Sequence, residues 1–181
     1  MQLPGHEAVV RPIPPATIGS AAQISLGALC KGGHVIKFRL TTVVNRPLEV
    51  VFAYLSDFMN LPEYEPWVEK VEATSAGPVG VGSTWHHVRR QGRRRLEAPI
   101  EIVEWEPNRR LAIRSGAGAF SVFTAQDFEQ NGDATRVTET LEMRVSGLLR
   151  LMEPLMRGQA RRQGEEIHQR FKEILERGAA S

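Results

Sequence analysis

The sequence predicts an α+β fold: a curved antiparallel sheet around a long C-terminal helix, with two short helices after the first strand. Three observations predict it. Strand-like segments follow one another from about residue 35 to residue 146, and glycine, proline and asparagine turns separate them. A long amphipathic pattern then runs from about Gly147 to Arg177. Strands first and a helix last indicate segregated elements rather than alternating ones.

The first part of the predicted domain contains one strand and two short helices. "VIKFRLTTVV" alternates as a strand should, and "NRPLEVVFAYLSDF" starts a helix in which Asn45 is expected to cap and Pro47 to occupy the first turn. Pro62 and Pro66 exclude a continuous helix in the segment that follows. A short bent segment and a second strand are therefore expected there.

Turn signals divide the next region into strands. Gly92 predicts one hairpin, Pro107 and Asn108 predict a turn, and residues 131–133 predict another hairpin. The strands that these turns connect are "STWHHVRRQ", "RRRLEAPIEIVEWE", "RRLAIRS", "AFSVFTAQDFEQ" and "TRVTETLEMRVS".

The apolar stripe of the terminal helix is thinned by small residues. It begins with Leu148, Leu149, Met152, Leu155 and Met156 and ends with Ile167, Phe171, Ile174 and Leu175. Between them, Ala160 and Gly164 lie on the same face at helical spacing. Small residues there predict an internal cavity that admits a ligand. The alternative is close helix-to-sheet contact without a void.

Bulk properties bound the class of protein. A chain of 181 residues suits one domain, and we expect a flexible extension over residues 1–33 and a ligand-binding domain over 34–181. The net charge of +2 does not imply general polyanion binding. The single Cys30 cannot form an intramolecular disulfide, and the sequence holds no long apolar run. We expect a soluble, cytoplasmic protein.

Glu139 is the first candidate for chemistry. Period-two alternation places it on the same strand face as Val137, Leu141, Met143 and Val145. A carboxylate on an apolar inner face needs a partner, a water or a ligand, or becomes protonated. It would then act as an acid or a base. The alternative places Glu139 near the rim of the sheet, paired with an arginine.

His87 and Arg89 share a strand face with Trp85, and the tryptophan favours that face as the inner one. His87 would transfer protons near neutral pH, and Arg89 would pair with Glu139 or hold an anionic group of a ligand. The alternative for His87 is an inert histidine with its hydrogen bonds satisfied. Because His86 and His87 project to opposite sides, we expect no metal site, and no other cofactor is expected.

Aromatic and thioether side chains complete the predicted cavity, although ordinary core packing would explain each one equally well. The predicted ligand-binding residues are Tyr64, Trp67, Trp85, Arg89, Phe120, Phe128, Leu141, Met143, Met156, Ala160, Gly164, Ile167 and Phe171.

The hairpin "RRQGRRR", Arg89–Arg95, carries five arginines in seven residues. A solvated turn is one interpretation, and contact of Arg93, Arg94 and Arg95 with an anionic membrane surface or a protein partner is the other. Nucleic acid is not expected as a partner, because no aromatic residue interleaves with these arginines.

Several segments resemble the SRPBCC superfamily of polyketide cyclase/dehydrase and lipid-transport proteins, which includes START domains. These segments are "VNRPLEVVFAYLSDFMNLPEYEPWVEKV", "GPVGVGSTW", "EWEPNRRLAIRS", "DATRVTETLEM" and "QRFKEILE". The resemblance spans about residues 35 to 177 and is closest to the polyketide cyclase-like branch. It implies the helix-grip fold, in which a curved sheet wraps the terminal helix. The same fold serves enzymes, carriers and sensors.

Three functions are therefore compatible with the sequence. The first is binding of a hydrophobic or aromatic small molecule, such as a polyketide-like compound, an isoprenoid or a lipid, in the internal cavity. The second is a cyclase, aromatase or dehydratase in which Glu139 and His87 transfer protons. The third is a non-catalytic interaction module that uses the arginine-rich hairpin.

Overall fold

The computed structural model describes residues 34–117, 120–145 and 153–178. The predicted extension, residues 1–33, lies outside these residues. So do Leu148, Leu149 and Met152 of the predicted helix stripe.

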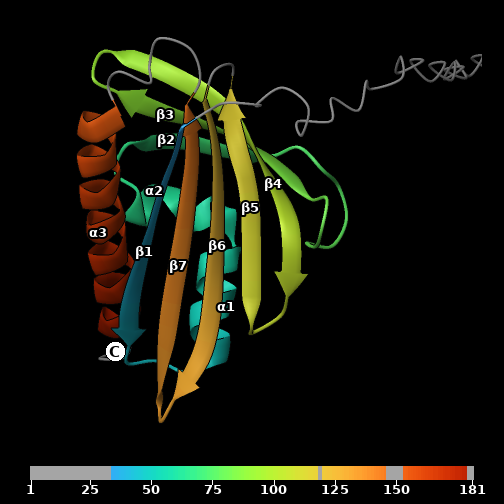
Figure 1. Ribbon diagram of the computed structural model, residues 1–181. Helices are drawn as coiled ribbons and strands as arrows, with labels where there is room; N and C mark the ends of the chain where they lie inside the picture. The colour runs from blue at the N-terminus through green and yellow to red at the C-terminus, as the bar shows by residue number, and fades with distance from the viewer. Residues whose placement is uncertain (1–33, 118–119, 146–152, 179–181) are drawn as a thin grey trace, which may run out of the picture. The chain divides into compact units, whose positions relative to one another are not determined.

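Seven antiparallel strands form one sheet in the order β1-β7-β6-β5-β4-β3-β2 (Figure 1). The strands are β1 (His34–Val44), β2 (Val68–Ala73), β3 (Thr84–Gln91), β4 (Arg94–Glu106), β5 (Arg110–Ala117), β6 (Phe120–Asn131) and β7 (Ala134–Val145). The helices are α1 (Leu48–Ser56), the 3-10 turn η1 (Phe58–Asn60), α2 (Leu61–Tyr64) and α3 (Glu153–Arg177). The predicted α+β fold class, with short helices after the first strand and a long terminal helix, is confirmed.

The strand register decides which residues face the helices. Glu139 of β7 pairs with Leu40 of β1 on one side and with Gln126 of β6 on the other. All three therefore lie on one face of the sheet. Val137, next but one to Glu139, is fully buried, so this is the covered face. We call it the concave face.

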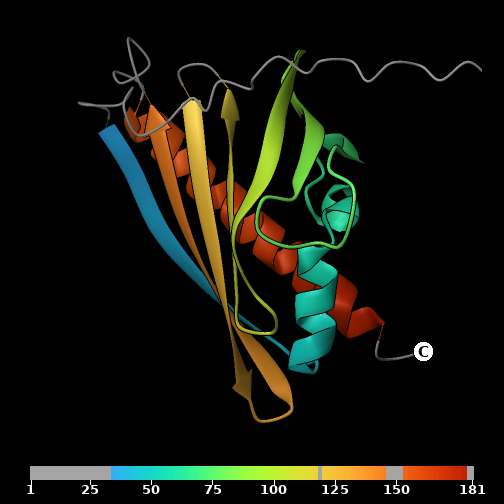
Figure 2. The same cartoon turned by 90° about the vertical axis from the view of Figure 1, so that its right-hand side faces the viewer.

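The helices all lie on this face (Figure 2). Helix α3 packs on β1 and contacts α2, whereas α1 packs on β6 and β7. No helix in the described part of the chain is long and apolar enough to cross a membrane.

Apolar side chains on the concave face form two separate clusters. The larger joins α1, η1 and α2 to the sheet and to Phe171 and Leu175 of α3. The smaller, which we call the upper cluster, has Ile36 and Met143 at its centre, with Phe38, Phe120, Val122, Leu141, Met156 and Ala160 only partly buried around them. It lies at the upper end of the sheet in Figure 1, where β1, β6 and α3 begin.

Two local predictions were wrong. Asn45 does not cap α1: Pro47 occupies the N-cap position, no side chain caps the helix, and the Asn45 backbone N–H donates to Glu176. Leu155 does not belong to the buried stripe, because it is 66% exposed. Helix α3 begins at Glu153, so Pro154 lies in its first turn, where its missing N–H costs no helical hydrogen bond.

Gly164 lies where α3 packs closely on the sheet. A Cβ atom at this position would lie 2.7 Å from Leu40 Cδ1 and 3.4 Å from Phe38 Cε2, both on β1. Close helix-to-sheet contact therefore accounts for this glycine, whereas Ala160, one turn earlier, stays partly exposed beside the upper cluster.

Candidate ligand-binding site

Glu139 lies on the concave face and is only 7% exposed. Its Oε2 atom accepts a hydrogen bond of 2.9 Å from Gln126 Nε2 and lies 3.8 Å from His168 Nε2. The alternative of a rim position paired with an arginine is therefore wrong. The expected pairing with Arg89 does not form among the described residues. A carboxylate with one amide donor keeps unused acceptor capacity, which a ligand donor would fill.

His168 is the partner of Glu139 that sequence reasoning missed. It lies on α3, is 4% exposed, and shares a 2.8 Å hydrogen bond through Nδ1 with Thr42 Oγ1 of β1. Its Nε2 makes no hydrogen bond with the described part of the protein. A signal was available, because His168 follows Gly164 by four residues and precedes Phe171 by three, which places all three on one helical face.

A second carboxylate, Glu65, follows the end of α2. Burial, together with the nearby charge of Glu139, raises its pKa to about 7, against the opposing effects of Arg89 and of a hydrogen bond from Trp67 Nε1. That hydrogen bond is 3.2 Å long. Glu65 therefore exchanges a proton near neutral pH.

Arg89 lies on the same strand face as Trp85 and His87, as predicted. Its guanidinium is 5.9 Å from the centre of the Trp67 ring, within range of a cation–π contact. Its positive charge also acts on the pKa of Glu65 and of His87. Arg89 thus places a cation between these two titratable groups.

His87 is buried, with 7% of its surface exposed, and its Nδ1 has no hydrogen-bond partner among the described residues. Burial, together with the charges of Arg89 and His86, lowers its pKa to about 4, while a hydrogen bond with the Ala98 backbone opposes this shift. The imidazole is therefore neutral at pH 7. It offers a ligand one ring nitrogen as a hydrogen-bonding group.

These side chains form one group on the concave face, the polar cluster: Glu65, His87, Arg89, Gln126, Glu139 and His168. In the described part of the chain, His87 and Glu139 share no hydrogen bond or ion pair. The charge of Arg89 acts on both His87 and Glu65, and the charge of Glu139 acts on Glu65. An unmade buried hydrogen bond costs about 1–3 kcal/mol. His87 Nδ1 and His168 Nε2, which make no hydrogen bond to any residue that the structure describes, therefore carry a cost that a bound polar group would remove.

The predicted cavity walls divide between the two apolar clusters. Phe120, Leu141, Met143, Met156 and Ala160 belong to the upper cluster. Tyr64, Phe128 and Phe171 are buried in the larger cluster, with Trp67 and Ile167 packed against it. Phe128 packs edge-on against Phe52 of α1, and Tyr64 packs edge-on against Phe171. The upper cluster therefore retains the more accessible apolar surface.

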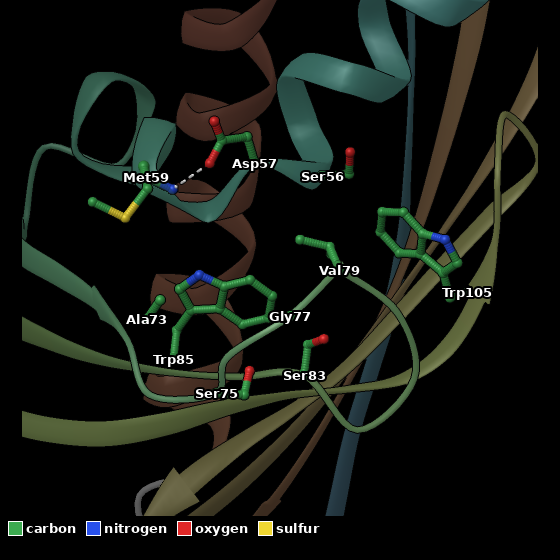
Figure 3. Close-up of a pocket in the computed structure, with 10 residues that line it drawn as sticks. All are labelled: Ser56, Asp57, Met59, Ala73, Ser75, Gly77, Val79, Ser83, Trp85 and Trp105. Atoms are coloured by element: carbon green, nitrogen blue, oxygen red, sulfur yellow. Dashed lines mark hydrogen bonds between the residues drawn. The ribbon is translucent and has the colours of Figure 1, made fainter.

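A pocket of about 420 Å³ lies at a different place on the concave face, among the end of α1, η1, the β2–β3 loop and β4 (Figure 3). Its lining residues are Ser56, Asp57, Met59, Ala73, Ser75, Gly77, Val79, Ser83, Trp85 and Trp105. Trp85 is the predicted ligand-binding residue among them. Its ring also packs against the ring of Phe58, with 4.7 Å between the ring centres. This pocket has no wall from α3.

No three His, Cys, Asp or Glu side chains in the described part of the chain are placed to hold a metal ion together. The polar cluster instead supplies proton donors and acceptors.

The sequence matches the family model described as polyketide cyclase / dehydrase and lipid transport over residues 35–176. The chain belongs to this family. No curated protein matches the sequence. The family match covers every described element of the sheet and all but the end of α3.

Solved structures of similar fold come from several sources. TTHA0849 from Thermus thermophilus is 21% identical, with a TM-score of 0.68 over 80% of this chain and 99% of that one. The aromatase/cyclase ZhuI from Streptomyces sp. R1128 is 15% identical, with a TM-score of 0.67 over 80% of this chain and 95% of that one. The di-domain aromatase/cyclase StfQ of the steffimycin pathway is 12% identical, with a TM-score of 0.66 over 81% of this chain and 52% of that one. At these identities the likeness concerns the fold.

Proposed function

We propose that this protein binds an apolar or aromatic small molecule, such as a polyketide-like compound, an isoprenoid or a lipid, between the sheet and α3. The observation that carries the proposal is the combination of the partly exposed upper cluster with the polar cluster on the same face, in which His87, Glu139 and His168 are buried and two ring nitrogens make no hydrogen bond to a described residue. Ligand sites typically join an apolar wall to a few convergent polar groups.

The chemistry of the polar cluster favours a ligand with an apolar body and one polar end. The apolar body would cover Phe38, Phe120 and Leu141, which remain partly accessible. The polar end would meet Glu139, His168 and the neutral His87. Carbonyl and hydroxyl groups suit these partners, because Glu139 accepts a hydrogen bond and a neutral imidazole donates or accepts one.

Native mass spectrometry of gently purified protein, with thermal-shift screening of lipids and aromatic polyketides, tests this proposal. A ligand at about one hundred times its Kd should stabilise the fold by about 2.7 kcal/mol. If no such compound is retained or raises the unfolding temperature, the proposal fails.

Two matched substitutions locate the ligand. Ala160→Trp would fill the space beside the upper cluster, and Ala73→Trp would fill the pocket of Figure 3. Loss of binding in Ala160→Trp alone supports the site between the sheet and α3. Loss in Ala73→Trp alone would move the ligand to the other pocket and contradict our placement.

A catalytic role is the second candidate function, favoured by the aromatase/cyclases among the similar structures and by the family description. Cyclisation and dehydration of a polyketide chain need a proton acceptor and a proton donor. Glu139 and His87 are the residues we assign. Glu65, with a pKa of about 7, joins them as a group that holds its proton for about half the time at neutral pH.

Turnover of a linear polyketide precursor tests this role. Glu139→Gln and His87→Ala should each lower kcat by about 100-fold or more if they transfer protons. Unchanged turnover in both variants would remove the assignment of Glu139 and His87 as catalytic residues. Ligand binding without turnover in the wild type would indicate that the protein is a carrier.

A further inference from the structure

The arginine hairpin, residues 89–95, forms the turn between β3 and β4. Gln91 pairs with Arg94, and Gly92 adopts a positive φ of 62°, so the turn is tight and holds Arg93 at its tip. The side chains of Arg90 and Arg95 are 64% and 71% exposed. The hairpin therefore presents the side chains of Arg90 and Arg95 to solvent.

The charge of this hairpin is only partly neutralised. One carboxylate, Glu69 of β2, pairs with both Arg90 and Arg95 at 2.5 Å and 2.8 Å. Arg93 and Arg94 form no ion pair with any residue that the structure describes. Because Arg93 and Arg94 have no ion-paired carboxylate among the described residues, the tip carries excess positive charge.

A depression and an apolar side chain accompany this charge. Arg90, Gly92, Arg93 and Arg95 line a depression of about 370 Å³, in which an anionic headgroup would meet several guanidinium donors. Leu96, which follows directly and pairs with Arg89, is 43% exposed. Arginines beside an exposed leucine match the composition of surfaces that dock at a bilayer interface.

The hairpin lies at the upper end of the sheet, where β1 and α3 begin, in both views (Figures 1 and 2). The partly exposed upper cluster lies at this same end. We propose that the arginine hairpin docks on an anionic phospholipid bilayer, with Arg93 and Arg94 against the headgroups and Leu96 at the interface. This goes beyond small-molecule binding and does not depend on it.

Co-sedimentation with vesicles tests the proposal. The full chain should bind vesicles that contain phosphatidylglycerol, should bind pure phosphatidylcholine vesicles far more weakly, and should be released by added salt. The double variant Arg93→Gln/Arg94→Gln should lower the partition coefficient by about 25-fold, since each basic residue near an anionic surface contributes roughly a factor of five.

The matched control removes the same charge at the other end of the sheet. Arg109→Gln/Arg177→Gln changes two exposed arginines, in the β4–β5 turn and at the end of α3. It should leave vesicle binding within about twofold, because these sites lie beyond the reach of screened electrostatics. Equal losses in both double variants would show a response to net charge alone and would overturn the proposal.

Two further results would contradict membrane docking. The first is the absence of binding to anionic vesicles by the wild type. The second is retention of the wild type on immobilised polyglutamate with no vesicle binding, which would assign the hairpin to an acidic protein segment. Thermal unfolding of each variant confirms that the fold persists, as expected for substitutions at exposed positions.

Discussion

His87 and Glu65 respond to pH in opposite directions, although both lie beside Arg89. The neutral form of His87 is favoured in the folded protein, because burial and the charges of Arg89 and His86 lower its pKa from 6.5 to about 4. The protonated form of Glu65 is favoured, because burial and Glu139 raise its pKa from 4.5 to about 7. Their contributions to the free energy of unfolding therefore oppose each other between about pH 4.5 and 6.5.

His87→Gln should remove the acid-side loss of stability. As the pH falls from 6.5 to 4, the unfolded chain takes up a proton on His87 and the folded chain does not, so the wild type is destabilised by up to about 3 kcal/mol. Urea unfolding across this pH range should show that the variant gains stability relative to the wild type as the pH falls. Parallel profiles for the two proteins would mean that His87 is not held neutral.

Glu65→Gln should have the opposite effect. As the pH rises from 4.5 to 7, the unfolded chain loses the proton of Glu65 first, so the wild type loses about 1–3 kcal/mol of stability that the variant keeps. At pH 8 the variant should unfold at a higher urea concentration. Glu49→Gln, at an exposed position with no hydrogen bond or ion pair to another described side chain, is the control and should follow the wild-type profile.

At the scale of elements, the contact between α3 and β1 fixes how closely the terminal helix lies to the sheet. Gly164 lets the helix approach Leu40 and Phe38 closely, while Ala160 and Met156 stay partly exposed. The helix is thus fixed to the first strand near its middle, and His168 is brought to Thr42 and Glu139 one turn later.

Gly164→Leu should destabilise the protein by about 1–3 kcal/mol, because a larger side chain would overlap Leu40 and force α3 away from β1. Gly158→Ala, in the same helix with no atom near its added Cβ, should instead stabilise by roughly 0.5–1 kcal/mol through helix propensity. Equilibrium urea unfolding measures both. An unchanged free energy of unfolding in Gly164→Leu would show that α3 can move away from β1 at little cost.

Much of this arrangement could be predicted from the alternation of side chains along two strands. Alternation along "STWHHVRRQ" and "RVTETLEMRVS" placed His87, Arg89 and Glu139 on the concave face, and the register confirms those faces. Glu65 could not be found this way. It lies in an irregular segment, and its raised pKa comes from burial and from the charge of Glu139, which comes near it only after folding. The prediction that Asn45 caps α1 was also wrong. Asn45 instead donates its backbone N–H to Glu176, which lies far along the chain.

At the scale of the whole molecule, all described elements belong to one sheet with its helices, which begins at His34. The domain boundary expected from the prolines and glycines before that residue stays a prediction. If residues 1–33 form the flexible extension expected from the sequence, their deletion should leave the unfolding temperature within about 2 °C. Differential scanning calorimetry of the shortened and full chains measures this.

A large fall in the unfolding temperature would contradict the boundary. A shortened chain that unfolds like the full one but no longer retains a ligand would instead assign the extension to binding.

The pairing of β1 with β7 also constrains how the chain folds. Strand β1 lies at one edge of the sheet, and its neighbour β7 is the last strand to be synthesised. A nascent chain would therefore carry its first strand unpaired until most of this sequence has left the ribosome. Contacts so distant in sequence slow the search for the native state. Until β7 arrives, the backbone N–H and C=O groups of His34–Val44 are open to strands of other chains, so this stage is where aggregation would begin.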